Sequence, residues 1–180
     1  MISTGDCLAA SVTDLAAELE PHIPALRRYA WALLRNQEAA DDLVQDCLER
    51  AITCWRLRRG DASTRAWLLT IQRNLFVNDL RRRSRQGRHV ELDEAHGHAA
   101  AEGGAERHLM ARDALSALDG LSEDQRSLLL LVGVEDLSYA EAAAVFGVPE
   151  GTIMSRLSRA RAQLRRLVDG GERVTLRRVK

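Results

Sequence analysis

Apolar residues recur every three or four positions along most of this chain, which is the spacing of amphipathic helices. The clearest run lies between residues 40 and 55, and it follows Asn36, a residue type that caps helix starts. Two shorter helices are expected before it, over residues 12–20 and 24–35, the second opened by Pro24. The apolar stripe of the main helix is predicted to comprise Ala40, Leu43, Val44, Cys47, Leu48, Ala51, Ile52 and Trp55.

The opposite side of this helix is densely acidic. Only Asp41 and Asp42 lie near the helix N-terminus, where the backbone dipole favours negative charge. The other acids therefore bring no benefit to this helix by itself. Two interpretations stay open, a docking surface for a partner and a face that is merely solvated. The stripe consists of Asp41, Asp42, Gln45, Asp46 and Glu49.

A further helix is predicted from Thr64, which would cap it, to about residue 83. Its buried stripe would contain Trp67, Leu68, Ile71, Leu75 and Leu80. The exposed side combines amides, which hydrogen-bond to bases, with guanidinium groups, which hold phosphates and stack on unpaired bases. Taken alone, Asn74 is better explained as an amide bonded within the protein than as a base contact. The exposed set is Arg73, Asn74, Asn78, Arg81, Arg82 and Arg83.

The segment from Ser138 to Leu167 has the pattern of a helix-turn-helix. Ser138 and Glu141 form a capping box, Gly147 suits a left-handed helix end, and Pro149 suits the first turn of a second helix. The first helix would pack through Ala140, Ala143, Ala144 and Val145, and the second through Ile153, Leu157, Ala160 and Leu164.

The second helix of this pair would read DNA through the residues near its start, Thr152, Ser155, Arg156 and Arg159. The alternative is a plain αα-hairpin with solvated arginines. Another helix, packed inside through Leu128 to Val132, is expected before the pair, after a capping box of Ser122 and Gln125.

Charge is distributed in blocks. The chain of 180 residues has 26 basic and 26 acidic residues, and all but one of the basic residues are arginine. Residues 1–50 and 91–136 carry net charges of −5 and −8, whereas residues 51–90 and 137–180 carry +8 and +5. A zero net charge argues against nucleic-acid binding, but two separate basic blocks favour a protein that touches DNA at two places.

Residues 86–107 contain four glycines and little apolar periodicity, so they are predicted to form a flexible linker. The histidines in and beside this linker do not have the spacing of a metal site, and no cofactor or catalytic centre is expected. The three cysteines are odd in number and are expected to be free thiols. No membrane span or secretion signal is found, which predicts a cytoplasmic protein. The histidines are His89, His96, His98 and His108.

The predicted fold is therefore all-α, with two small helical domains joined by a flexible linker. Four motifs in order, DDLVQDCLERA, RAWLLTIQRNLFVNDLRRR, the linker and the segment from LSEDQRSLLLL to RARAQLRRL, resemble the extracytoplasmic-function (ECF) group of bacterial sigma factors. Within that group the pattern is similar to the lineage of the alphaproteobacterial general stress response. The domains would be a sigma region 2 over residues 10–85, a linker over 86–107, a sigma region 4 over 108–168 and a tail over 169–180.

The resemblance implies the partners and roles of these surfaces. The DLVQ-containing helix would dock on the β′ clamp of core RNA polymerase through Asp41, Asp42, Leu43, Gln45, Asp46 and Glu49. The β flap of polymerase is a further expected partner of the protein. Arg73, Asn74, Asn78, Arg81 and Arg82 would contact the minus-ten element, with Asn74 and the loop from Gly60 to Arg65 capturing an unpaired base. Thr152, Ser155, Arg156 and Arg159 would enter the minus-thirty-five major groove.

The family also implies promoter-specific transcription initiation, for a stress regulon in this lineage, and regulation by an anti-sigma factor. Met154 departs from the family pattern, where a basic residue is common, so a DNA contact would be missing there and the sequence preference shifted. Two rivals remain. One is a sigma-like module that sequesters an anti-sigma factor without binding DNA, and the other is a simple repressor, which leaves residues 24–83 unexplained. An enzyme is the least favoured class.

Overall fold

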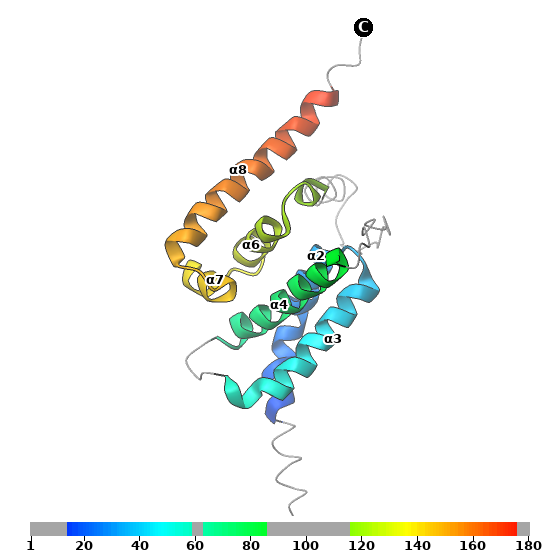
Figure 1. Cartoon of the computed structure of the whole chain (residues 1–180), viewed down its shortest axis with the longest axis vertical. Coiled ribbons are helices and arrows are strands. Elements are labelled where there is room, and N and C mark those ends of the chain that lie inside the picture. Colours follow the sequence, from blue (N-terminus) through cyan, green and yellow to red (C-terminus); the bar gives the residue numbers. More distant parts are fainter. Residues whose placement is uncertain (1–13, 59–62, 86–115, 176–180) are drawn as a thin grey trace, which may run out of the picture. The chain divides into compact units, whose positions relative to one another are not determined.

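The computed structural model describes residues 14–58, 63–85 and 116–175, with side chains described up to Asp169 (Figure 1). The described residues form helices and turns and contain no strand, in agreement with the predicted all-α fold. The chain divides into two compact units, Met1–Ala95 and His96–Lys180, which we call the first and the second unit. The predicted linker and its histidines lie outside the described residues.

The first unit is a bundle in which α3 packs against both α2 and α4. A helical segment at residues 14–19 leads into the short helix η1 (Glu20–His22) and then α2 (Ile23–Leu34). The helix α3 (Gln37–Cys54) continues into η2 (Trp55–Leu57), and α4 (Thr64–Arg85) is the longest helix of this unit. The largest fully buried side chains at the centre are those of Leu26, Tyr29, Leu33, Leu68 and Leu69.

Local signals set most helix ends in this unit. The helix α2 starts with proline in its first turn, as predicted, and ends at Arg35, which has a left-handed φ of 55°. The predicted cap of α3 is confirmed, because Asn36 Oδ1 accepts a hydrogen bond from the Ala39 backbone N–H at 2.9 Å. At α4 the predicted cap was off by one residue. Ser63 Oγ accepts from Ala66 N–H at 3.4 Å, and Thr64 is the first residue of the helix.

The predicted buried stripe of α3 is confirmed except at its C-terminal end. Ile52 is 54% exposed, and Leu48 and Trp55 are half-buried. At about 100° per residue, Ile52 projects between Gln45 and Leu48, nearer the acidic side than the core. The i, i+4 step from Leu48 therefore led away from the buried face. Fully buried on this helix are Ala40, Leu43, Val44, Cys47 and Ala51.

The buried face of α4 also differs from the prediction. Trp67, Ile71, Leu75 and Leu80 are only half-buried, whereas Leu68 is buried as expected. A polar residue occupies the middle of the true buried face, because Gln72 is 0% exposed and its Nε2 donates to the Leu26 carbonyl at 3.0 Å. The predicted stripe contained apolar residues alone and did not include Gln72, so its centre differs from that of the buried face. The buried set is Ala66, Leu68, Leu69, Gln72 and Phe76.

Cys47 is a buried free thiol of the first unit, whose Sγ donates to the Leu68 carbonyl at 3.4 Å. Burial raises its pKa from 9.0 to about 12, against a smaller opposing effect of the Gln72 backbone N–H. The folded thiol therefore stays protonated at a pH where the unfolded thiol ionises, and stability should fall as the pH rises from 9 towards 12.

We expect iodoacetamide at pH 8 to alkylate the half-buried Cys54 in the folded protein and Cys47 only after unfolding in urea. Mapping the alkylated cysteines by mass spectrometry checks this. Urea unfolding at pH 8 and pH 10 checks the linkage, and Cys47→Ala should lose this part of the pH dependence. Equal alkylation rates of Cys47 and Cys54 in the folded protein would contradict the assignment.

The second unit packs three helices around one small core. After a helical segment at residues 116–119 come α6 (Glu123–Gly133), α7 (Tyr139–Phe146) and α8 (Glu150–Thr175), each in contact with the other two. Both predicted capping boxes are present, at Ser122 with Gln125 and at Ser138 with Glu141. Gly147 ends α7 with a φ of 64°, as predicted. Leu128, Ala142, Ile153 and Leu157 form the core.

Two details of this unit correct the sequence analysis. On α7 the buried residues are Ala142 and Val145, whereas Ala140 and Ala144 are exposed. Pro149 precedes α8 instead of lying within its first turn, and its carbonyl accepts from Thr152 N–H at 2.9 Å. The predicted inner face of α8 is confirmed at Ile153, Leu157 and Ala160, while Leu164 is half-buried.

Candidate nucleic-acid and protein interfaces

The acidic stripe on α3 is exposed to solvent. Asp41, Asp42, Gln45, Asp46 and Glu49 are all exposed, because the helix turns its opposite face to α2 and α4. Leu43, which the sequence analysis placed in both the core and the docking set, is only 8% exposed. It therefore supports the stripe from beneath and offers little surface itself.

The carboxylates of the stripe differ in how far the protein itself compensates them. Asp41 lies 3.6 Å from Arg27 Nε and accepts from Gln37 Nε2 at 2.9 Å. Glu49 accepts from Gln45 Nε2 at 3.1 Å. Asp42 and Asp46 make no hydrogen bond or ion pair with the rest of the described chain. Within the stripe, these two carboxylates are thus the most available to a basic side chain of a partner protein.

The outer side of α4 presents the predicted amides and arginines unevenly. Asn74 and Asn78 are exposed, and so are Arg81 and Arg82, whereas Arg73 is half-buried and engaged within the protein. Asp79 lies 2.8 Å from Arg82 and 2.6 Å from Arg83. Asp79 therefore partly compensates the positive charge of Arg82 and Arg83. Arg81 has no such acidic partner among the described residues. The Asn74 amide is exposed and is therefore not packed inside, while its contact with a base stays a prediction.

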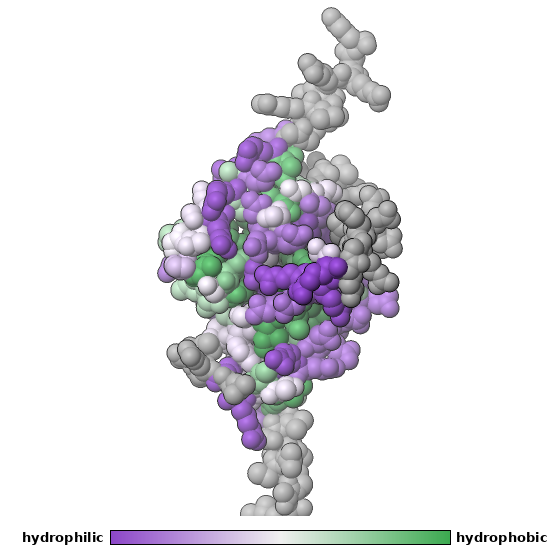
Figure 2. All heavy atoms as spheres, viewed as in Figure 1, coloured by the Kyte–Doolittle hydropathy of each residue, from purple (hydrophilic) through white to green (hydrophobic). Residues whose placement is uncertain are grey.

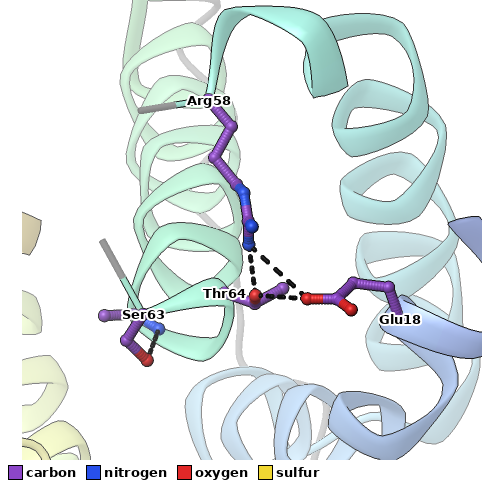
Figure 3. Close-up of polar contacts among 5 residues, drawn as sticks. Glu18, Arg58, Ser63 and Thr64 are labelled. Carbon is purple, nitrogen blue, oxygen red and sulfur yellow. Dashed lines mark hydrogen bonds and ion pairs between the residues drawn. The ribbon is translucent and has the colours of Figure 1, made fainter. Parts of the chain in front are cut away.

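Polar residues from three segments meet at the start of α4 (Figure 3), and two tryptophans lie beside them. Thr64 Oγ1 donates to Glu18 Oε1 at 3.0 Å and accepts a hydrogen bond from Arg58, whose Nη1 lies 3.8 Å from the same Glu18 oxygen. The Arg58 guanidinium lies over the Trp55 ring at 4.7 Å, and Trp55 meets Trp67 edge-on at 5.7 Å. The sequence analysis missed Glu18 and Arg58, because only the fold brings them together.

His22 belongs to the same neighbourhood. Burial lowers the pKa of His22 below its usual 6.5, and the positive charges of Arg65 and Arg58 lower it further, whereas Glu18 acts in the opposite direction. His22 is therefore neutral at physiological pH. The residues between Arg58 and Ser63, including most of the predicted base-capturing loop, lie outside the described residues.

The helix-turn-helix presents the four predicted contact residues on α8. Ser155 and Arg159 are exposed, and Thr152 and Arg156 are half-buried. Ser155 Oγ donates to the Thr152 carbonyl at 3.0 Å, and Arg159 Nε donates to the Ser155 carbonyl at 3.3 Å. These bonds to the helix backbone hold the Ser155 and Arg159 side chains along α8. Met154 is 49% exposed beside them, an apolar side chain on a polar face.

An open pocket of about 310 Å³ separates the N-terminal end of α6 from α8. Arg156 and Arg159 line it from α8, and the acid Asp124 lines it from α6. The arginines therefore face a mixed environment rather than a purely basic one. The lining consists of Ser122, Asp124, Gln125, Leu128, Arg156 and Arg159.

The visible surface is dominated by hydrophilic side chains (Figure 2). Large exposed apolar side chains among the described residues are Ile52, Val134, Met154 and Val168. Within the same residues, no helix is long and apolar enough to cross a membrane, and no group of His, Cys, Asp or Glu is arranged to hold a metal ion.

Two family descriptions match the chain. Residues 19–72 match the Sigma2 domain of PhyR, and residues 111–164 match Sigma-70, region 4. The ECF RNA polymerase sigma factor EcfG of Rhodopseudomonas palustris is 42% identical over 156 residues, which cover 83% of this chain and 83% of EcfG. The chain belongs to the family of ECF RNA polymerase sigma factors.

Other relatives of this sigma factor agree. SigC of Mycobacterium tuberculosis is 38% identical, covering 81% of this chain and 80% of SigC. Among solved structures, the sigma factor RpoE in complex with the anti-sigma factor NepR from Bartonella quintana superposes with a TM-score of 0.76 at 37% identity. That match covers 87% of this chain and 97% of RpoE. The predicted family, and the lineage of EcfG and RpoE within it, are confirmed.

Proposed function

We propose that this sigma factor binds core RNA polymerase in the cytoplasm and directs it to the promoters of a stress regulon. The observation that carries the proposal is the presence, on one chain, of three separate exposed faces of suitable chemistry. These are the uncompensated carboxylates of α3, the amide and arginine face of α4, and the outward face of α8. The similarity to EcfG and to RpoE supports the stress assignment.

Each of the two family matches supports a separate role for one of the two domains. A region 2 domain over residues 10–85, supported by the match over residues 19–72, docks on polymerase and reads the minus-ten element. A region 4 domain over residues 108–168, supported by the match over residues 111–164, reads the minus-thirty-five element. Residues 86–107 link the domains and residues 169–180 form a tail, of which α8 includes the part up to Thr175. Two weak DNA contacts joined by a linker raise the effective concentration of each other.

The α3 stripe is the polymerase-docking surface, with the β′ clamp as the main partner and the β flap as a contact of region 4. Asp42 and Asp46 carry the largest share, because their carboxylates are not compensated by neighbouring cations. Gln45, Glu49 and Asp41 extend the surface, and Leu43 supports it from the core.

DNA is bound without covalent chemistry, so the protein needs neither a catalytic centre nor a cofactor. On α4, Asn74 hydrogen-bonds an unpaired base while Asn78, Arg81, Arg82 and Arg73 hold the strand. Each captured base offsets part of the cost of unstacking the duplex, which biases the promoter toward melting. On α8, Thr152, Ser155, Arg156 and Arg159 contact base edges and phosphates of the minus-thirty-five element.

Regulation by an anti-sigma factor is part of the proposal. RpoE of Bartonella quintana was solved with the anti-sigma factor NepR, and CnrH, which superposes with a TM-score of 0.63 at 28% identity, was solved with the cytosolic domain of CnrY. A partner of this kind would bind this sigma factor and keep it from polymerase.

Single-round transcription with purified core polymerase on a library of promoter fragments tests the function. Asn74→Ala and Arg159→Ala should each reduce the specific transcript by about tenfold or more, since a base contact is worth about 1–3 kcal/mol. Arg166→Ala is the matched control, because Arg166 is an exposed arginine of α8 well beyond the recognition segment. A loss in both test variants but not in the control supports two separate reading faces.

The sigma-like module without promoter binding remains the second candidate. The observation that favours it is the match of residues 19–72 to the Sigma2 domain of PhyR, since PhyR of Bartonella quintana is described as an anti-anti-sigma factor in complex with NepR. The same transcription assay separates the two. Stable binding to an anti-sigma factor with no specific transcript from any fragment would favour the module and reject promoter selection.

A further inference from the structure

The cluster in Figure 3 joins three parts of the first unit that are distant in sequence. Glu18 comes from the helical segment at residues 14–19, Arg58 follows η2, and Thr64 opens α4. Arg58 and Thr64 stand on either side of residues 59–62. Thr64 donates a hydrogen bond to Glu18, and Arg58 lies 3.8 Å from the same carboxylate oxygen, so Glu18 contacts both ends of that connection.

The Thr64 hydroxyl is the centre of this arrangement. It donates a hydrogen bond to Glu18 and accepts a hydrogen bond from Arg58, so both neighbours determine the rotamer of Thr64. Arg58 is well enclosed, with 18% of its side chain exposed, whereas 48% of the Glu18 side chain is exposed. The direct Arg58 to Glu18 contact is long at 3.8 Å and half in water, so the hydrogen bond through Thr64 contributes more than the ion pair.

The cluster also contacts the aromatic pair of Trp55, from η2, and Trp67, from the first turn of α4. The Arg58 guanidinium covers Trp55, and Trp55 meets Trp67 at 74° between ring planes. The backbone N–H of Trp67 donates to the Ser63 carbonyl at 3.0 Å in the first turn of α4. Asn74 follows Trp67 by seven residues, which is about two helical turns and about 10 Å along the axis. Trp67 and Asn74 therefore lie on the same side of α4.

We propose that Glu18 is a positioning residue for the single-stranded minus-ten element. Through Thr64 it holds Arg58 and the Trp55–Trp67 pair in one geometry. This fixes both ends of the connection between η2 and α4 at the start of the helix side that carries Asn74. The unpaired base then meets a preorganised site, and less ordering is needed on binding. This inference rests on the proposed reading of the minus-ten element by α4.

The test uses holoenzyme formed from core polymerase and the full chain. The probe is a fork-junction DNA from a promoter recovered by the transcription assay, double-stranded upstream and single-stranded over the minus-ten element. A series of probes carries one abasic site at each single-stranded position. The discrimination ratio is the Kd for an abasic probe divided by the Kd for the intact probe, at the position where the wild-type ratio is largest.

Glu18→Ala and Thr64→Val should each lower the discrimination ratio by about tenfold, the effect of one lost hydrogen bond at a preorganised site. The double variant should be no worse than Thr64→Val alone, because Thr64→Val already removes the hydrogen bond to Glu18. Glu18→Gln keeps the acceptor for Thr64 and loses only the ion pair, so its ratio should stay within about twofold of wild type. Glu20→Ala, an exposed acid two residues away, is the matched control.

Affinity for core polymerase separates positioning from a general loss of structure, and it should be unchanged in every variant. Thr64→Val keeps the test decisive if Glu18→Ala proves unstable. A Glu18→Ala ratio equal to that of Glu20→Ala, or additive effects of Glu18→Ala and Thr64→Val, would overturn the inference while leaving the proposed function intact. A wild-type holoenzyme with no preference at any position would overturn both.

Discussion

Replacing Leu157 by Ala is expected to unfold the second unit and leave the first unit folded. Leu157 is 1% exposed and packs in a small core cluster with Leu128, Ala142 and Ile153. A buried Leu→Ala change costs about 2–5 kcal/mol. A helical unit of this size has a stability of only about 3–5 kcal/mol, so the change removes most or all of it.

The tryptophans make this result easy to observe. Trp31, Trp55 and Trp67 all lie in the first unit, so tryptophan fluorescence reports on that unit alone. In urea the fluorescence transition of Leu157→Ala should coincide with that of wild type, while helical circular dichroism is already reduced without denaturant. Binding to a duplex minus-thirty-five element should be lost.

Val168→Ala is the matched control for Leu157→Ala. Val168 lies on the same helix but is 46% exposed, so its truncation should change the stability by no more than about 0.5 kcal/mol. A fluorescence transition that shifts together with the loss of helicity would show that the two units unfold as one, contrary to the expectation of separate cores.

Reversing charge at both Asp42 and Asp46 to arginine should reduce affinity for core polymerase by about 100-fold or more. Both carboxylates are exposed and uncompensated, and placing like charges against a basic partner surface costs several kcal/mol. The fold should be retained, since both positions are exposed on the surface of α3 and their side chains pack against nothing in the core. The wild-type affinity should also fall steeply with salt, and that of the variant much less.

Fluorescence anisotropy of labelled sigma factor with core polymerase measures this affinity, and thermal unfolding checks the fold. Glu20→Arg provides the control, because it reverses an exposed acid of the same unit that lies outside α3. Unchanged binding of the double variant would return the stripe to the simpler interpretation of a solvated face, and the docking proposal for α3 would then fail.

Local signals predicted most helix boundaries of both units. A cap, a capping box or a left-handed glycine involves only residues within one turn of each other, so Asn36, Ser138 and Gly147 could be recognised before any fold was known. The helix-turn-helix and its inner face at Ile153, Leu157 and Ala160 followed from the same short-range patterns.

Which face of α4 is buried could not be derived in the same way. Gln72 is polar and fully buried, because the carbonyl of Leu26, forty-six residues away, accepts its hydrogen bond. Hydrophobic periodicity assumes that polar residues face water, and a buried amide with a distant partner violates that assumption. Ile52 is the reverse case, an apolar residue that the packing of α3 leaves in solvent.

The sequence by itself determined the helical class, the order of the helices, the family and the chemical types available for binding, because these depend on composition, spacing and local hydrogen bonds. Only the tertiary structure decided which acids of α3 are uncompensated and that Glu18, Arg58 and Thr64 meet at the start of α4. Contacts across forty-six residues depend on how the helices pack, and packing is set by the summed burial of many side chains rather than by any local pattern.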